Sequence, residues 1–474
     1  MKTLKLKTIQ VVLLLTTLIN FSPAQAKMTK FKPKDALTEN SVEKYNAILE
    51  QYKINADNVS LQILDDSEVV FSLNPDKKKV PASISKILTS FAILKKLPID
   101  HKFYTRLYSD GKNLYLKGGG DPCFVSENLW QLVNEFTRSG IKVVKGNIVV
   151  DDSLFDKIRF DESRQDKRVD RAYDSPVGAM SFNWNAVNIF VKPAKIGQKA
   201  VVTVDPDSEY FDLKNNTTTV SGKARKELVV SISNSQKLIT VSGDVAAGDK
   251  EKAIYKGVAE PDIWAGTNLS YFLEQRDIVV EGKVVTGKVP DTAELVASYE
   301  SKNLNNILAD MNKFSNNFVA EMLVKGLAAQ NQKTGASLKQ GVESIREELA
   351  KIGITRDEIV ILNPSGLTHD NLFSASSLNK VLMNMKKDFS VYPTFLNGLP
   401  IAGIDGTLKK RMKNTEAEGW VRAKTGYLDG VVSLAGFAGR RDGSVLTFTF
   451  LYNGPRDEAI VREAFDQLLV SSLK

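Results

Sequence analysis

A serine and a lysine lie three positions apart at Ser83 and Lys86, a spacing that puts both side chains on one side of a helix. Pro81 favours a helix start, and apolar residues recur at helical intervals after Lys86, so one face of this helix should be buried. A lysine amine withdrawn from water favours its neutral form, which can take the serine proton. The pair therefore predicts acyl transfer through a serine acyl-enzyme.

The same Ser-x-x-Lys spacing recurs at 41–44 and 377–380, where it is typical of the first turn of an ordinary helix. The tetrapeptide is thus weak evidence by itself. Partners from elsewhere in the chain are needed to single out Ser83.

Two further polar patterns follow in order along the chain. Ser315-Asn316-Asn317 lies in a helical region, 311–323, where a helix or its connecting turn can present short polar groups. Lys424-Thr425-Gly426 is predicted to end one strand and enter the next, and on an edge strand it offers a cation, a hydroxyl and a residue without a side chain to an extended substrate. A second Lys-Thr-Gly, at 333–335, is predicted only to connect two helices.

The chain contains only two histidines, His101 and His369, and one cysteine, Cys123. No histidine or paired-cysteine spacing typical of a metal site is present, and no cofactor motif is recognisable, so we expect neither. No Gly-x-Ser-x-Gly motif accompanies the histidines, which favours a lysine base over a Ser-His-Asp triad. Cys123 cannot form an intramolecular disulfide and is expected to be a small packed residue.

The first 26 residues resemble a secretory signal, with a basic start, an apolar run from Ile9 to Phe21 and Ala24-Gln25-Ala26 before the cleavage point. We therefore expect a periplasmic or otherwise exported protein with no transmembrane segment in the mature chain; an uncleaved anchor is the weaker alternative. Removing residues 1–26, with three lysines and no acid, lowers the net charge from +8 to +5. That mild excess, without a recognisable nucleic-acid module, argues against a nucleic-acid partner.

The 474 residues are enough for two or three domains, and the patterning predicts a discontinuous one. Short alternating runs with polar turns predict a mostly β insertion over 101–262, with room for two subdomains. Residues 27–100 and 263–474 would form the domain that carries Ser83. Its expected helices are at 41–54, 262–276, 304–329, 337–352 and 457–473, and its expected strands are at 59–73, 419–424, 431–440 and 444–452.

Taken together, Ser83-x-x-Lys86, Ser315-x-Asn317 and Lys424-Thr425-Gly426 resemble the three signatures of penicillin-recognising serine enzymes. More narrowly, the chain resembles the DacB-type D-alanyl-D-alanine carboxypeptidases/endopeptidases, the class C low-molecular-mass penicillin-binding proteins. That resemblance runs through segments at 73–75, 81–83, 146–151, 175–183, 364–367 and 399–408. It implies an α+β fold, a penicillin-binding-protein/β-lactamase-like transpeptidase domain in which helices flank an antiparallel sheet, with a large insertion between the first two motifs.

The resemblance also implies roles. Ser83 would attack the D-Ala-D-Ala bond of a peptidoglycan stem peptide, with Lys86 as base and Ser315 relaying a proton. Asn317 would hold a substrate amide, and β-lactams would act as covalent inhibitors. Lys424 and Thr425, beside Gly426, would bind the terminal carboxylate, and the N–H groups of Ser83 and Tyr427 would bind the oxyanion.

Two positions depart from the family pattern. Tyr427 stands where Ser or Thr is common, and His369 where an arginine is usual, so neither an accessory hydroxyl contact to the carboxylate nor stem-peptide specificity is assigned. Asp166 and Asp170 fit the spacing of a substrate-amine contact poorly and are also left unassigned.

Three functions stay open at this point: a carboxypeptidase that can also act as an endopeptidase, a serine β-lactamase, and a non-catalytic wall-binding relative. A β-lactamase needs a residue that activates the deacylating water. The nearest match to the Glu-x-x-Leu-Asn loop of one β-lactamase class is 358–363, which is one residue too long.

Overall fold

The computed structural model describes residues 39–164 and 174–474. Its central sheet has five strands in the order β16-β17-β18-β1-β2, and all neighbours are antiparallel. The strands are β1 (Val59–Asp65), β2 (Glu68–Leu73), β16 (Val421–Leu428), β17 (Val431–Gly439) and β18 (Val445–Asn453). Because β1 pairs with β18, from Val59 opposite Tyr452, the two ends of the chain complete one sheet.

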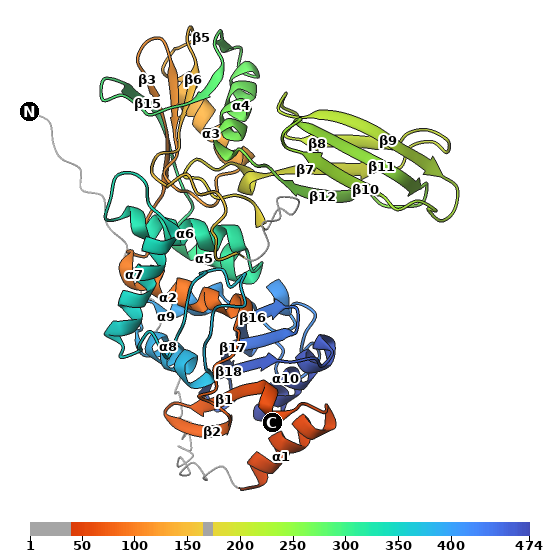
Figure 1. Ribbon diagram of the computed structural model, residues 1–474, viewed down its shortest axis with the longest axis vertical. Coiled ribbons are helices and arrows are strands. Elements are labelled where there is room, and N and C mark those ends of the chain that lie inside the picture. Colours follow the sequence, from red (N-terminus) through yellow and green to blue (C-terminus); the bar gives the residue numbers. More distant parts are fainter. Residues whose placement is uncertain (1–38, 165–173) are drawn as a thin grey trace, which may run out of the picture.

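Helices cover both faces of this sheet (Figure 1). On one face lie the first and last helices, α1 (Glu39–Gln51) and α10 (Glu458–Ser472). On the other lie α2 (Lys86–Lys96), α5 (Leu304–Lys313), α6 (Asn317–Ala329), α7 (Leu338–Lys351), α8 (Ala375–Lys387) and α9 (Tyr392–Gly398). The expected α+β architecture, an antiparallel sheet flanked by helices, is confirmed.

Helix α2 differs from its expected one-sided burial. Every residue from Lys86 to Leu94 is buried, because helices α5 to α9 and the sheet enclose it on all sides. A helix that is buried all round needs polar partners for its polar groups. Thr89 Oγ1 accordingly donates to the Pro364 carbonyl at 3.0 Å, and Ser90 Oγ accepts from Asn312 Nδ2 at 3.0 Å.

The region between the first two motifs is mostly β, as expected. One sheet has the order β14-β6-β4-β3-β15, and α3 (Ser126–Thr137) and α4 (Pro261–Glu274) pack beside it. Its strands are β3 (Tyr104–Ser109), β4 (Leu114–Lys117), β6 (Ile148–Asp151), β14 (Val284–Thr286) and β15 (Glu294–Glu300), and β5 (Val143–Val144) pairs with β13 (Val279–Val280) nearby.

Two three-stranded sheets form a second β unit, which projects to one side of the molecule in Figure 1. Their inward-facing apolar residues share one hydrophobic cluster with the first inserted sheet. The strands are β7 (Ala186–Lys192), β8 (Val201–Asp205), β9 (Asp212–Val220), β10 (Val229–Ser233), β11 (Leu238–Ala246) and β12 (Lys252–Gly257).

The strand pairing argues against the expected boundary between the inserted region and the catalytic domain at 262/263. That boundary falls inside α4, and β15 hydrogen-bonds to β3 from Glu300 opposite Tyr104 to Glu294 opposite Ser109. Ser301 then binds Phe103 through both backbone and side chain. We propose that the inserted region runs from about Phe103 to Ser301, because an inserted sheet must include its last strand.

Two local expectations are also corrected. The helical region 304–329 is interrupted between α5 and α6, where Ser315 has a φ of 55°. Strand β16 continues to Leu428, so Lys424-Thr425-Gly426 lies within the strand rather than at its end.

In the described ranges, 39–164 and 174–474, no helix combines the length and apolarity needed to cross a membrane. The expected signal at 1–26 and the unassigned Asp166 and Asp170 lie outside these ranges.

Candidate active site

The Ser83 hydroxyl lies next to the Lys86 amine. Ser83 is half-buried in a 3₁₀ turn, η2 (Ala82–Ser85), which leads directly into α2 at Lys86. Lys86 Nζ lies 3.1 Å from Ser83 Oγ. The preceding Ala82 has a φ of 50°, a left-handed conformation that costs about 1–3 kcal/mol for a residue with a side chain and is common near functional sites.

Two other groups hold the Lys86 amine. Nζ donates to Asn317 Oδ1 at 2.7 Å and to the Ser365 carbonyl at 2.5 Å. Lys86 is completely buried, and burial first, then the nearby Lys424 cation, lowers its pKa well below the usual value for lysine. The lowered pKa favours a neutral amine, as the acyl-transfer hypothesis requires.

The second and third motifs meet at Ser315 and Lys424. Ser315 occupies the left-handed turn between α5 and α6, and its Oγ accepts a hydrogen bond of 2.8 Å from Lys424 Nζ. Lys424 Nζ also donates to the Thr425 carbonyl at 2.8 Å. Lys424 is fully buried, which lowers its pKa to about 7.

Asn317 is the first residue of α6, whose N-terminus is capped by Asn316 Oδ1 accepting from the Val319 N–H at 3.1 Å. The cap fixes the start of the helix, so the Asn317 side chain points back to Lys86. Its Nδ2 donates to Asp174 Oδ1 at 3.3 Å.

Gly426 allows β16 to approach the turn that carries Ser83. A Cβ at Gly426 would lie 2.1 Å from Ser433 Oγ, 2.7 Å from the Pro81 carbonyl oxygen and 3.1 Å from the Ser83 nitrogen. No side chain fits there. Strand β16 lies at the edge of the sheet, and on its outer side the segment 400–402 bonds to Val421 and Ala423, just before the motif begins. The next hydroxyl along it, Thr425 Oγ1, lies 2.8 Å from Thr407 Oγ1.

The Tyr427 side chain is directed to α10. Its hydroxyl donates to Glu458 Oε2 at 3.0 Å, the Arg462 guanidinium lies 5.6 Å from the ring centre, and 56% of the residue is exposed. His369, the other departure from the family pattern, places Nε2 3.4 Å from the Asp429 carbonyl.

The repeated tetrapeptides and tripeptide are not part of this arrangement. Ser377 Oγ bonds to the backbone and side chain of Ser374 at the start of α8, and Lys380 pairs with Glu358 at 2.5 Å. Ser41 lies within α1, which begins at Glu39. Lys333-Thr334-Gly335 connects α6 to α7, as expected.

Sequence reasoning missed four residues that surround Lys86 or its partners. They are Arg164, Asp174, Glu321 and Ser365, all of them buried. The available signals were local: Ser365 lies in a segment already quoted for the resemblance, and Asp174 directly precedes another. Cys123, in contrast, is a buried free cysteine, as expected.

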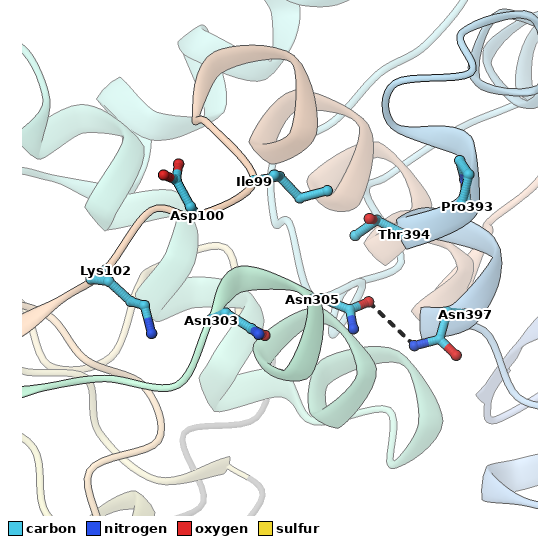
Figure 2. Close-up of a pocket in the computed structure, with 8 residues that line it drawn as sticks. All are labelled: Ile99, Asp100, Lys102, Asn303, Asn305, Pro393, Thr394 and Asn397. Carbon is cyan, nitrogen blue, oxygen red and sulfur yellow. Dashed lines mark hydrogen bonds between the residues drawn. The ribbon is translucent and has the colours of Figure 1, made fainter. Parts of the chain in front are cut away.

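A separate pocket lies elsewhere, with a volume of about 620 Å³. Figure 2 shows its lining, which includes Ile99 and Asp100 just beyond α2, and Asn305 bonded to Asn397 at 3.2 Å. Since Ser83 precedes α2, the two sites are separated by the length of that helix, about 16 Å. In the part of the chain that the structure describes, no cluster of three or more His, Cys, Asp or Glu side chains could hold a metal ion.

Several known D-alanyl-D-alanine carboxypeptidases are similar to this chain. A D-alanyl-D-alanine carboxypeptidase of Actinomadura sp. (strain R39) is 30% identical over 466 residues, covering 93% of this chain and 85% of the relative. DacB of Haemophilus influenzae is 27% identical over 414 residues, covering 82% and 84%. The crystal structure of penicillin-binding protein 4 (dacB) from H. influenzae shares the fold, with a TM-score of 0.77 at 24% identity over 91% of this chain and 99% of that one.

The sequence profile of the D-Ala-D-Ala carboxypeptidase 3 (S13) family matches residues 41–472, nearly all of the region that follows the expected signal. With a match of that extent, and with the serine and two lysines of the three motifs brought together in one site, the chain belongs to the D-Ala-D-Ala carboxypeptidase 3 (S13) family.

Proposed function

We propose that Ser83 is the nucleophile through which this D-Ala-D-Ala carboxypeptidase forms an acyl-enzyme with peptidoglycan stem peptides. The observation that carries the proposal is the 3.1 Å contact between Ser83 Oγ and the fully buried Lys86 amine. A neutral amine at that position can accept the hydroxyl proton as Oγ attacks the carbonyl carbon between the two D-alanines.

The developing oxyanion would be bound by the backbone N–H groups of Ser83 and Tyr427. Loss of one such donor typically costs about 10² to 10³ in rate. This assignment does not use the Tyr427 hydroxyl, which is engaged with Glu458.

Expulsion of D-alanine requires a proton for the leaving amine. Ser315 accepts a hydrogen bond from Lys424, so it can give its own proton to the leaving nitrogen and recover one from Lys424. Water then attacks the ester carbon and passes a proton through Ser315 back to Lys424, while the bond to Ser83 Oγ breaks and Oγ recovers its proton from Lys86. The shortened peptide leaves with a new terminal carboxyl group.

The substrate would lie along the outer side of β16. Lys424 and Thr425 would bind its terminal carboxylate, Gly426 would leave space for its backbone, and Asn317 would contact an internal amide. Thr407 places a second hydroxyl beside that of Thr425, where it could contact the substrate carboxylate. The Tyr427 side chain does not supply this accessory hydroxyl.

We also propose that β-lactams acylate Ser83. The carbonyl of a β-lactam presents the same electrophile as the D-Ala-D-Ala bond, and the structure of H. influenzae penicillin-binding protein 4 complexed with a β-lactam shares the fold with a TM-score of 0.72. Two predatory endopeptidases of Bdellovibrio bacteriovorus reach TM-scores of 0.50 and 0.52, which favours testing cross-linked peptides as well.

The β-lactamase alternative is disfavoured because Glu358, its candidate for activating the deacylating water, is poorly suited to act as a base. Glu358 accepts hydrogen bonds from Lys380 at 2.5 Å and from the Thr355 N–H at 2.9 Å, and these bonds lower its pKa to about 2. A carboxylate with so low a pKa is a poor base for activating water. The non-catalytic alternative is disfavoured because Ser83 contacts Lys86, Ser315 contacts Lys424, and the charge of Lys424 is near enough to lower the pKa of Lys86.

Location is part of the proposal. The family and the expected signal favour export, with the mature protein starting at Lys27. Intact mass of protein recovered from the periplasm or medium would establish the start; a chain that keeps residues 1–26 would contradict cleavage.

The test of function uses protein lacking residues 1–26. It should form a stable adduct with fluorescent penicillin and release D-alanine from a stem pentapeptide, and the Ser83→Ala variant should do neither. Rapid penicillin hydrolysis without peptide cleavage would instead indicate a β-lactamase. Chromatography of digested cell walls would show whether cross-linked dimers are also cleaved.

A further inference from the structure

A buried network links the inserted region to the amine of Lys86. Arg164 Nε and Nη2 donate to the two carboxylate oxygens of Glu321 on α6, at 2.7 and 2.6 Å. Both residues are essentially inaccessible, with 1% of each exposed. The bidentate geometry gives this pair a fixed orientation.

From this pair, one route to Lys86 passes through Ser365. Asn363 Nδ2 donates to Glu321 Oε1 at 3.3 Å, Ser365 Oγ donates its proton to Asn363 Oδ1 at 2.5 Å, and the carbonyl of Ser365 accepts from Lys86 Nζ. Glu321 therefore helps to hold the loop whose carbonyl contacts the amine.

The other route passes through Asp174. Arg164 Nη1 donates to the Asp174 carbonyl at 2.9 Å, and Asp174 Oδ1 accepts from Asn317 Nδ2 at 3.3 Å. The opposite end of that amide, Asn317 Oδ1, accepts from Lys86 Nζ at 2.7 Å. An amide whose Nδ2 is held by a carboxylate must turn its oxygen toward Lys86, so Asp174 orients Asn317.

We propose that Asp174, which the inserted region supplies and Arg164 fixes in place, is a positioning residue that orients Asn317 and sets the charge around Lys86. The inserted region then contributes to catalysis through Asn317. This inference rests on the proposed function of Ser83 and Lys86 and adds a role for a residue outside the three motifs.

The charges around Lys86 predict the direction in which its pKa should change when Asp174 is replaced. Lys424 on β16 and Arg164 lower the pKa of Lys86, whereas Glu321 on α6 and Asp174 raise it. Removing the Asp174 charge should therefore lower the pKa of Lys86 further, so the free base should persist to lower pH.

The experiment compares Asp174→Asn with Asp174→Ala. Asn keeps an oxygen acceptor for Asn317 but no charge, and Ala removes both. We expect both variants to shift the acid limb of the acylation-rate profile to lower pH. The plateau rate should stay within about threefold for Asp174→Asn and fall about tenfold or more for Asp174→Ala, because Asn317 loses its partner.

Asp156→Asn is the matched control. Asp156 pairs with Lys325, one turn further along α6 from Glu321, at 2.6 Å, so it also links the inserted region to α6 but lies outside the routes to Lys86. It should lower the melting temperature and leave the acid limb unchanged. The proposal would be overturned if the acid limb of the acylation-rate profile did not move in Asp174→Asn, or if it moved by the same amount in Asp156→Asn.

A small fluorophosphonate makes the outcome independent of penicillin recognition. Ser83 Oγ forms a bond to phosphorus, fluoride leaves, and the serine proton passes to Lys86; mass spectrometry locates the adduct. Labelling of Ser83 without any reaction with penicillin or peptide would refute the proposed function, and the labelling profile would still judge the role of Asp174. Absence of any reaction of Ser83 in the wild-type protein, with the fluorophosphonate, penicillin and peptide alike, would refute both.

Discussion

The backbone nitrogen of Ser83 lies 3.1 Å from the point where a Cβ on Gly426 would be, so two motifs more than 300 positions apart are in contact through their backbones. The packing of β16 against η2 thus defines the distance between the nucleophile and the strand that binds substrate.

Replacing Gly426 with alanine should separate these two elements. The added methyl would collide with Ser433 Oγ and the Pro81 carbonyl, which bond to each other at 2.6 Å. We expect penicillin acylation to slow by about 10² or more, since misplacement by about 1 Å can cost that much. Stopped-flow or gel-based labelling would measure the rate.

Gly248→Ala provides the control for that substitution, because a Cβ at Gly248 would meet nothing within 4 Å. Both variants should be compared at a temperature where each is folded. Normal acylation by Gly426→Ala would show that the close approach is dispensable.

Lys424 should make stability depend on pH. Its pKa is lowered from 10.5 to about 7 in the folded protein, so between these values the unfolded chain binds more protons. The unfolding free energy should therefore rise from pH 7 to pH 10 by up to about 1.4 kcal/mol per pH unit from this group. Urea unfolding of the wild-type protein and Lys424→Met would measure the difference, and parallel curves for the two would contradict it.

Thr407 should contribute to substrate binding. Its hydroxyl lies 2.8 Å from that of Thr425, and a neutral hydrogen bond contributes about 0.5–1.5 kcal/mol. Thr407→Val should raise KM for a pentapeptide about threefold to tenfold with little change in kcat. Thr203→Val on β8 is the control, and an unchanged KM in Thr407→Val would exclude the contact.

Tyr427→Phe should have little effect on catalysis. It removes an exposed hydroxyl that bonds to Glu458 and leaves the backbone N–H in place. We expect kcat/KM within about twofold of the wild-type value, because the proposed oxyanion contact is a backbone one. A loss of about 10² or more in kcat/KM in steady-state assays would show that the hydroxyl takes part in catalysis, although it is directed toward α10.

The buried Arg164–Glu321 pair should be sensitive to removal of one partner. Glu321→Gln leaves the Arg164 charge buried without its counterion, and breaking such a pair typically costs about 3–5 kcal/mol. Urea unfolding should show most of that loss recovered when Arg164→Met is added. A double variant less stable than Glu321→Gln would contradict this explanation.

The sequence allowed the three motifs to be found because each is local: a spacing on one helix, a polar turn, a triplet on a strand. Lys86 and Lys424 could be selected in this way. Asp174 and Glu321 could not, since their importance arises from tertiary contacts that no periodicity records. The full burial of α2 was missed for the same reason, because Lys86, Thr89 and Ser90 look like a solvated face until their partners at 317, 364 and 312 are known.

The pairing of β1 with β18 has a consequence for biosynthesis. Strand β1 pairs at once with β2, which follows it, but it cannot acquire its second partner, β18, until the chain is present as far as residue 453, whereas the inserted sheets use strands that are complete by Glu300. Contacts between such distant segments form slowly, because a long loop must close first. The inserted region can therefore fold before the site that contains Ser83 and Lys86 is complete. The enzyme stays inactive until its last strands have joined the central sheet.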